Sequence, residues 1–216
     1  MDRLSDLELA ALMCSRVCHD IISPVGAIVN GLEVLEDDDD PDMRAHAMDL
    51  ITKSATQASN KLQFARLAFG AAGSAGAELD LADAERVAGA FLADGRTELV
   101  WSGPAATMGK DWVKLLLNLI LLAMNAIPRG GQLAVTVAVG ERPRLQVTAS
   151  GQGSRRPDEA LGFLQGTAEA GIDARSVQPY FTRQVAEFVG AEIAASMDGE
   201  QFVVTAEARG SGIGQA

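Results

Sequence analysis

Histidine is scarce in this sequence, which contains only His19 and His46. Asp20 directly follows His19, and Arg16 precedes it by about one helical turn. A free imidazole has a pKa of about 6.5, so near pH 7 it is largely neutral and keeps a nitrogen lone pair for nucleophilic attack. Asp20 is placed to orient or polarise that ring. His19 is therefore the candidate nucleophile of the chain.

A proline, Pro24, lies five residues after His19, inside a pattern that otherwise predicts a helix. A proline inside a helix costs about 3 kcal/mol. It also removes the backbone hydrogen bond to the carbonyl of Asp20, which loosens the turn just after His19. The flank that carries His19 continues with apolar and small residues, where a face that met only water would be polar. We expect this flank to bind a partner through Ile22, Ser23, Gly26 and Val29.

Each of these features also has a simpler interpretation. A single histidine on a helix is usually an ordinary surface residue, and Asp20 and Arg16 would then belong to a solvated helix face. We expect this of His46, which has no adjacent acid or proline. The acidic run 37–40 could steer basic partners, but a solvated helix turn is its simpler explanation.

The element that must position His19 is a long amphipathic helix, predicted over residues 5–36 from apolar residues at alternating steps of four and three. Ser5 and Glu8 predict a capping box at its start, and the aspartate run with Pro41 ends it. A second helix is predicted from Pro41 to Phe69. A lone hairpin cannot hide stripes this long, so we expect a four-helix bundle in a homodimer. The predicted stripes are Leu7, Ala11, Cys14, Cys18, Ile21, Val25, Ile28, Leu32 and Leu35, then Ala47, Ile51, Ala55, Ala58, Leu62, Ala65 and Phe69.

A segment of small residues, GAAGSAGAE, follows the two helices and predicts a linker. Beyond it, helices mixed with largely antiparallel strands predict an α+β sandwich in which helices cover one sheet. The helices are predicted near 81–93, 109–127, 157–165 and 176–189, and the strands near 97–102, 132–139, 144–150, 191–197 and 201–208. The predicted organisation is thus an all-α helical hairpin (1–71), a linker (72–79), an α+β domain (80–209) and a flexible tail (210–216).

Composition excludes several classes of protein. The 216 residues are 48% hydrophobic, which is enough for a packed core, and the net charge of −11 argues against a nucleic-acid binder. Two cysteines four residues apart do not form a secreted disulfide framework. The most apolar stretch, 112–127, is shorter than the roughly 20 residues of a membrane span, and the N-terminus lacks the features of a signal peptide. We expect a cytoplasmic protein without a membrane segment.

The segment RVCHDIISPVGAI, from Arg16 to Ile28, resembles the H-box of two-component signalling proteins, in which a histidine, an acid and a proline recur on the first helix of a dimeric bundle. Over nearly its full length the chain resembles the ChpT-type histidine phosphotransferases of alphaproteobacteria. The segments LQFARLAFGA from Leu62 and LNLILLAMNAIPRGG from Leu117 support that resemblance. It implies a hairpin for dimerisation and histidine phosphotransfer, followed by a degenerate form of the histidine kinase ATPase domain.

The resemblance implies that His19 accepts a phosphoryl group from the phospho-aspartate of a hybrid kinase receiver domain and passes it to the receivers of response regulators. Neutral imidazole can accept the group without a strong base, and Arg16 could offset phosphate charge. Phosphoryl transfer depends mainly on in-line positioning and charge neutralisation. The resemblance implies that the receiver also brings the Mg²⁺, and we expect no cofactor of the chain's own because its sequence shows no metal-ligand spacing.

The second domain lacks the residues that a nucleotide-binding kinase domain would need. Where the family's DxGxG loop would follow a strand, the chain reads ASGQG, with Ala149 in place of the adenine-binding aspartate. Asn118 and Asn125 are either remnants of the family's asparagine helix or helix-capping groups, and SGQG is more simply a turn. We expect a protein phosphotransferase that does not use ATP. The alternatives are an ATP-dependent sensor histidine kinase core and a non-catalytic dimeric adaptor.

Overall fold

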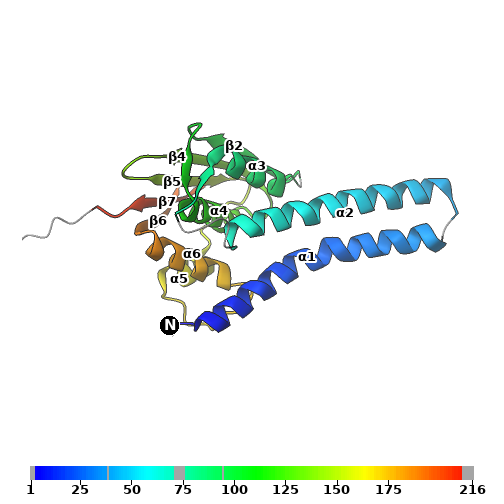
Figure 1. The fold of residues 1–216 in the computed structure, drawn as a ribbon, viewed down its shortest axis with the longest axis horizontal. Helices are drawn as coiled ribbons and strands as arrows, with labels where there is room; N and C mark the ends of the chain where they lie inside the picture. The colour runs from blue at the N-terminus through cyan, green and yellow to red at the C-terminus, as the bar shows by residue number, and fades with distance from the viewer. Residues whose placement is uncertain (1–2, 38, 71–75, 94, 211–216) are drawn as a thin grey trace, which may run out of the picture.

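The structure is a computed structural model that describes residues 3–37, 39–70, 76–93 and 95–210. Two long helices, α1 (Asp6–Asp37) and α2 (Pro41–Ala68), form an antiparallel hairpin that projects from a mixed α/β domain (Figure 1). The predicted combination of a helical hairpin and an α+β domain is therefore confirmed. The predicted tail beyond 210 lies outside the described residues.

Local hydrogen bonds fix the ends of both hairpin helices. The predicted capping box is present, since the backbone N–H of Ser5 donates to the Glu8 carboxylate at 2.8 Å and the N–H of Glu8 donates to the Ser5 hydroxyl at 3.3 Å. Asp40 caps α2, accepting from the N–H of Asp42 at 2.9 Å. The last aspartate of the acidic run thus starts the second helix as well as ending the turn. Asp38 lies outside the described residues.

The face of α1 that meets α2 differs from the predicted stripe. The buried residues of α1 are Pro24 and Gly31, whereas Leu7, Val25 and Leu32, which the heptad pattern placed in the seam, are exposed in the single chain. At Gly31 the helices approach so closely that an added Cβ would lie 2.6 Å from Cγ1 of Ile51. Gly31 therefore marks the point where α1 and α2 are in close contact. A pattern of apolar residues does not reveal this point, because glycine has no side chain. On α2, Ser54 and Phe64 are buried where the prediction named Ala55 and Leu62.

The α/β domain is built on a five-stranded sheet of order β2-β4-β5-β7-β6, in which β2 and β4 are parallel and the other neighbours antiparallel. Side chains on one face of the central strands are buried and those on the other face are partly exposed. One face of this sheet therefore meets the core. The strands are β2 (Thr97–Ser102), β4 (Gly131–Ala138), β5 (Arg144–Ser150), β6 (Ala191–Asp198) and β7 (Gln201–Ala208).

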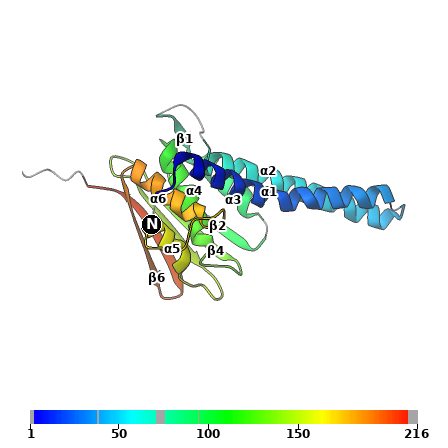
Figure 2. The same cartoon turned by 90° about the horizontal axis from the view of Figure 1, so that it is seen from below.

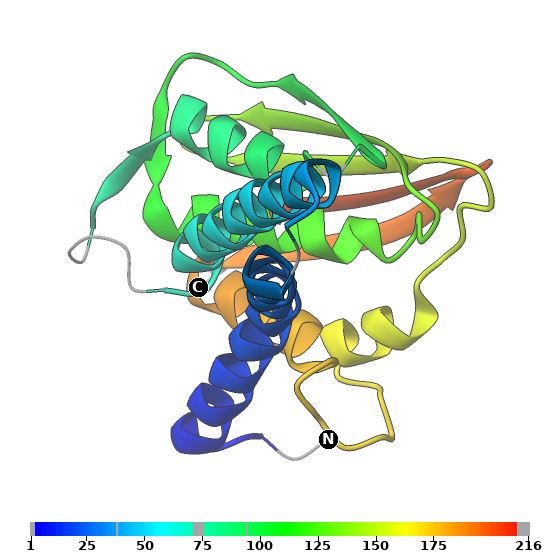
Figure 3. The ribbon, with the colours of Figure 1, turned by 90° about the vertical axis from the view of Figure 1, so that its right-hand side faces the viewer.

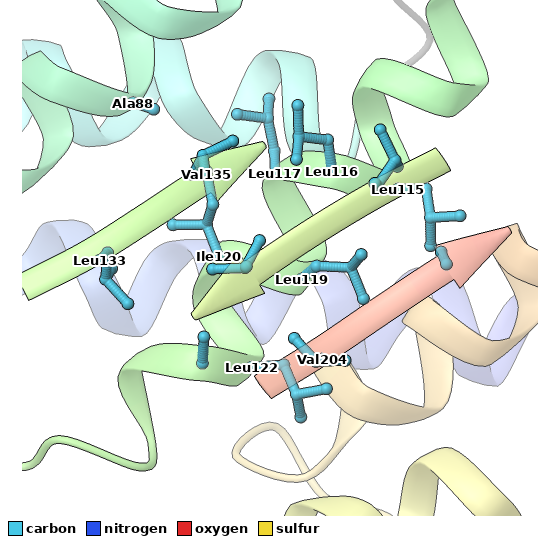
Figure 4. Close-up of a cluster of buried hydrophobic side chains, with 14 of the residues drawn as sticks. Ala88, Leu115, Leu116, Leu117, Leu119, Ile120, Leu122, Leu133, Val135 and Val204 are labelled. Carbon is cyan, nitrogen blue, oxygen red and sulfur yellow. The ribbon is translucent and has the colours of Figure 1, made fainter. Parts of the chain in front are cut away.

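Helices cover the buried face of the sheet, as predicted, and α2 packs against two of them (Figure 2). The central helix is α4, in which all the leucines but Leu121, and the isoleucine, are fully buried in one core with Leu133, Val135 and Val204 (Figure 4). The stretch WVKLLLNLILLAMNAI is thus the main core of the domain. The helices are α3 (Leu81–Leu92), α4 (Lys110–Met124), α5 (Asp158–Gln165) and α6 (Val177–Phe188).

Two very short strands escaped the prediction. β1 (Glu78–Asp80) pairs antiparallel with β3 (Thr107–Gly109) at the start of the domain. Three residues are too few to show an alternating pattern. Of the predicted linker 72–79, residues 72–75 lie outside the described residues, and the last two residues belong to β1. The domain limits otherwise stay a prediction.

Buried polar groups fasten the hairpin to the domain. Asn118 is fully buried on α4 and donates to the carbonyl of Ala68 at 2.8 Å, in the last turn of α2. Gln178 on α6 donates to the Asn118 side chain at 3.0 Å. Asn60 of α2 donates to the carbonyl of Ala90 on α3 at 2.9 Å. These bonds hold the base of α2 in one position relative to the sheet.

By length and composition alone, α1 is the one helix among the described residues that could cross a membrane, with a mean hydropathy of 1.3 over its most apolar window. The sequence had drawn attention to a different stretch, 112–127. Arg16, His19 and Asp20 lie near the middle of α1, and α2 packs along it. The expected absence of a membrane segment stays a prediction.

Candidate functional site

His19 lies near the middle of α1 with 67% of its side chain exposed. Its Nδ1 atom lies 3.5 Å from Oδ1 of Asp20, the long limit of a hydrogen bond. Among the described residues, no hydrogen bond engages Nε2. If Nδ1 carries the ring proton and donates to Asp20, the lone pair is on Nε2 and faces outward from that contact. Asp20 is thus placed to favour the tautomer in which Nε2 is the free nitrogen.

Arg16 and Asp20 are joined across one turn of the helix. Nε of Arg16 lies 2.9 Å from Oδ2 of Asp20, and both side chains are only partly exposed. The two oxygens of Asp20 therefore point to different partners, one to the guanidinium and one to the ring of His19. Arg16 also reaches the carbonyl of Arg175, at 3.4 Å, in the loop before α6. The three residues that the sequence singled out are brought together, and their roles stay a prediction.

Pro24 is buried within α1, and a residue of α2 compensates for its missing N–H. Nζ of Lys61 lies 3.1 Å from the carbonyl oxygen of Asp20, which is the carbonyl that residue 24 would otherwise bond in a regular helix. Sequence reasoning identified that carbonyl but missed Lys61. Only the register of the hairpin shows which α2 side chain reaches it.

The flank beside His19 is open, as expected from the sequence. Ile22 is 70% exposed, Ser23 is exposed and Val29 is 48% exposed. Gly26 is half-buried, but a Cβ added there would meet no atom within 4 Å. Val25 is exposed on the same side, although the prediction placed it in the hairpin seam. The structure therefore places all four predicted residues on an accessible face, and their binding of a partner stays a prediction.

A cleft of about 1200 Å³ lies beside this site, between the hairpin and the α/β domain. Five basic and four acidic side chains line it, in a chain whose net charge is −11. Figure 3 shows the tip of the hairpin end-on, with α6 and α5 below it; these two helices carry part of the opposite wall. The cleft is thus a region of locally balanced charge on an acidic protein. Its basic residues are Arg16 and Lys61 from the hairpin and Arg155, Arg156 and Arg175 from the domain.

One acidic residue of the cleft is held in a tight turn. The backbone N–H of Ser176, the Ser176 hydroxyl and the N–H of Arg175 all donate to Oδ1 of Asp173, each at 2.8 Å. The N–H of Ser176 is the main cause, followed by its hydroxyl, of a pKa of Asp173 below its ordinary value. The carboxylate thereby orders the segment whose Arg175 carbonyl meets Arg16.

The positions that resemble a nucleotide site have structural roles here. Ala149 is fully buried in the sheet, where its register partners are Leu133 and Phe202. A Cβ on Gly151 would lie 2.5 Å from the carbonyl oxygen of Gly130, so this glycine allows two loops to touch. This supports the interpretation of SGQG as a turn. Asn118 fastens α2 as described, and Asn125 follows α4 and donates to Leu121 at 3.3 Å.

The remaining candidates contribute little to the site. His46 is exposed on α2, and its Nδ1 lies 2.6 Å from the carbonyl of Asp42 in the same helix, as expected of a surface histidine. Within the described ranges, no three His, Cys, Asp or Glu side chains are grouped as a metal ion requires. Cys14 and Cys18 are free and exposed.

Comparison with known proteins finds clear relatives of this chain. Residues 81–201 match the family model of the histidine phosphotransferase C-terminal domain. The chain is 49% identical to protein phosphotransferase ChpT of Brucella abortus (strain 2308), over 94% of this chain and 97% of that protein. A solved bacterial phosphotransferase superposes with a TM-score of 0.87 at 46% identity, covering 95% of this chain and 98% of the other. The histidine kinase AdeS of Acinetobacter baumannii is far less similar, with 13% identity and a TM-score of 0.46 over 88% of this chain and 96% of that one.

Proposed function

Because this chain belongs to the ChpT-type histidine phosphotransferases, we propose that it is the phosphohistidine carrier of a phosphorelay, with His19 as the phospho-acceptor. The observation that carries this proposal is the contact between Asp20 and Nδ1 of an exposed His19, which leaves Nε2 free. The donor is the phospho-aspartate of a hybrid kinase receiver domain, and the acceptors are the receivers of response regulators.

The chemical step requires little from the protein beyond orientation. The Nε2 lone pair attacks phosphorus in line with the acyl-phosphate bond of the donor; the P–N bond forms as the P–O bond breaks, and the donor carboxylate leaves. Nδ1 keeps its proton, so the phosphorylated ring is cationic and the Asp20 carboxylate stabilises it. Arg16 holds the other oxygen of Asp20 and so fixes that carboxylate. In the second transfer, the carboxylate of a response regulator attacks and the same bonds form and break in reverse.

We propose that the receiver supplies the Mg²⁺ that neutralises the phosphoryl oxygens, and that no cofactor of this chain takes part. The receiver docks on the face formed by Ile22, Ser23, Gly26 and Val29. An apolar, accessible patch next to the nucleophile lets the partner exclude water, which prevents loss of the phosphoryl group by hydrolysis.

A second copy of the chain is the expected partner of the hairpin. Two exposed apolar residues lie seven positions apart on one side of α1, and further exposed apolar residues lie on α2. Two hairpins packed as a four-helix bundle would cover both sets. The residues concerned are Val25 and Leu32 on α1 and Met43, Leu50 and Leu62 on α2.

We further propose that the chain does not use ATP and works in the cytoplasm. The aspartate that would bind adenine is replaced by Ala149, which has no acceptor and lies in the core. Two free, exposed cysteines suit a reducing compartment. An ATP-dependent kinase would instead take label from the γ-phosphate of ATP, and a non-catalytic adaptor would bind receivers without becoming phosphorylated.

A transfer assay separates these three functions. The purified chain is mixed with a phosphorylated receiver or with γ-labelled ATP, and label on the chain is followed over time. We expect label from the receiver alone, its loss in His19→Ala and its retention in His46→Ala. Transfer that survives His19→Ala would overturn the proposal, and label from ATP alone would favour the kinase.

A further inference from the structure

The turn of α1 that carries the site has a gap in its hydrogen bonding. Residue 24 of a regular helix would donate its N–H to the carbonyl of Asp20, but Pro24 has no N–H. Pro24 is buried, and the contact at the Asp20 carbonyl is partly buried. A carbonyl in such a place needs another donor to keep the turn in one conformation.

Lys61 provides that donor from the other helix of the hairpin. Its Nζ lies 3.1 Å from the carbonyl oxygen of Asp20, and its side chain is half-buried between the helices and the cleft. This hydrogen bond joins α2 to the backbone of the turn that carries His19. The hydrogen bond is charge-assisted, and such bonds are stronger than neutral ones.

The helix that carries Lys61 is itself held in place. The preceding residue, Asn60, donates to the carbonyl of Ala90 on α3, and Asn118 of α4 bonds the last turn of α2. Lys61 therefore extends from a helix fixed to the α/β domain, whereas the turn that it contacts is weakened by Pro24. Its ammonium group therefore ties this turn to a helix that is fixed to the α/β domain.

We propose that Lys61 is a positioning residue for phosphotransfer, which fixes the backbone of Asp20 so that its carboxylate keeps Nδ1 of His19 protonated and Nε2 free. This rests on the proposed function of His19. The carboxylate receives Arg16 on one oxygen and His19 on the other. A shift of its backbone would disturb both contacts together.

The test compares Lys61→Met, which keeps the length of the side chain and removes its donors, with Lys61→Arg, which keeps a cationic donor. Lys53→Met is the matched control, because Lys53 lies on the same helix with 75% of its side chain exposed and bonds Asp49. The measurements are the rate of transfer from a phosphorylated receiver and the nitrogen NMR shifts of the His19 ring above pH 8, which report the tautomer.

We expect Lys61→Met to slow transfer roughly tenfold, as loss of one charge-assisted hydrogen bond implies, and to shift the ring toward the Nε2–H tautomer. Lys61→Arg should largely retain the transfer rate and the tautomer of the natural protein, and Lys53→Met should leave both unchanged. An unchanged tautomer in Lys61→Met overturns the proposal, whatever the rate. The tautomer is measured without any phosphate, so this failure is distinct from failure of the proposed function, which His19→Ala tests.

A second pair of variants tests the route through the carbonyl. Pro24→Ala restores the N–H that bonds the carbonyl of Asp20, so Lys61 should become dispensable. We expect Lys61→Met to slow transfer at most twofold when combined with Pro24→Ala, both rates being compared with Pro24→Ala alone. The same tenfold loss in both backgrounds would mean that Lys61 acts elsewhere, and would overturn the proposal. Because the comparison is internal, any effect of Pro24→Ala on its own cancels.

Discussion

Oδ1 of Asp20 lies 3.5 Å from Nδ1 of His19, while the other oxygen of the same carboxylate is bonded to Arg16 at 2.9 Å. The carboxylate is therefore held from one side and faces the ring with the other. It belongs to the same helix as both partners, so no movement of one domain against another is needed to assemble the group. The imidazole and its two partners are therefore already grouped in the isolated chain, as the proposed transfer without a strong base requires.

The first prediction concerns this carboxylate. Asp20→Asn should slow phosphotransfer by about tenfold or more, because a neutral amide stabilises a cationic imidazole less than a carboxylate does. The fold should be unaffected, since Asp20 is partly exposed. Rates of labelled phosphoryl transfer check this, and Asp49→Asn is the control because Asp49 forms an equivalent ion pair with Lys53 on α2. Equal rates in the two variants would remove Asp20 from the mechanism.

The second prediction concerns the docking face. Ile22→Glu should weaken binding of the receiver, since it places a charge in an apolar patch one turn after His19, but it should leave the dimer and the stability intact. Phe188→Glu, at a residue 78% exposed on α6, is the control. Transfer rates against receiver concentration and light-scattering masses check this. A variant that becomes monomeric, or that binds the receiver normally, would place Ile22 outside the docking face.

The residues of the site that lie on one helix could be predicted from the sequence. The helical period of 3.6 residues per turn places Arg16 and Asp20 together, and Pro24 is identified by its residue type alone. Lys61 could not be found in this way, because its contact depends on the register of two helices. The same limit explains the error in the seam: α1 is apolar on more than one face, and the face that α2 covers is set by the fit at Gly31.

The fold was predictable where its patterns are long. The apolar helix around Leu117 and the alternating strand 144–150 appear as expected, because each repeats one period over several turns or residues. The three-residue strands β1 and β3 carry no such repeat. Their pairing joins residues 27 to 31 positions apart in the chain, from Asp80 with Thr107 to Glu78 with Gly109. Sequence periodicity does not contain that information.

The third prediction concerns two glycines of α1. Gly31→Ala should destabilise the protein by about 1–3 kcal/mol, because its Cβ would press on Ile51 and on the carbonyl of Ala47. Gly26→Ala should instead stabilise it by about 0.5–1 kcal/mol, since the position is open and alanine favours the helix. Urea unfolding checks both. If both variants changed the free energy of unfolding in the same direction, the hairpin would not pack as described.

The fourth prediction concerns Ala149, where a kinase nucleotide site would have an aspartate. Ala149→Asp should not restore ATP binding and should destabilise the protein by about 3 kcal/mol or more, because it buries a carboxylate beside Leu133 and Phe202. Thr148→Asp, on the half-buried opposite face of the same strand, should reduce the stability much less. Thermal unfolding and a fluorescent nucleotide titration check this. ATP binding by a folded Ala149→Asp would show that the site needs only this one residue.

The fifth prediction concerns pH and the turn at Asp173. Hydrogen bonds from the backbone and the hydroxyl of Ser176 lower the pKa of Asp173 in the folded protein. A group whose pKa is lower when folded stabilises the fold at pH values above its unfolded pKa, and that contribution is lost as the pH falls through the folded pKa. Acid should therefore loosen the 173–176 turn, and with it the contact between the Arg175 carbonyl and Arg16. NMR titration of the carboxyl carbon checks this. Ser176→Ala should move the pKa upward toward its ordinary value, because the hydroxyl is lost while the backbone donor stays. An unchanged pKa in that variant would show that the hydroxyl does not hold the carboxylate.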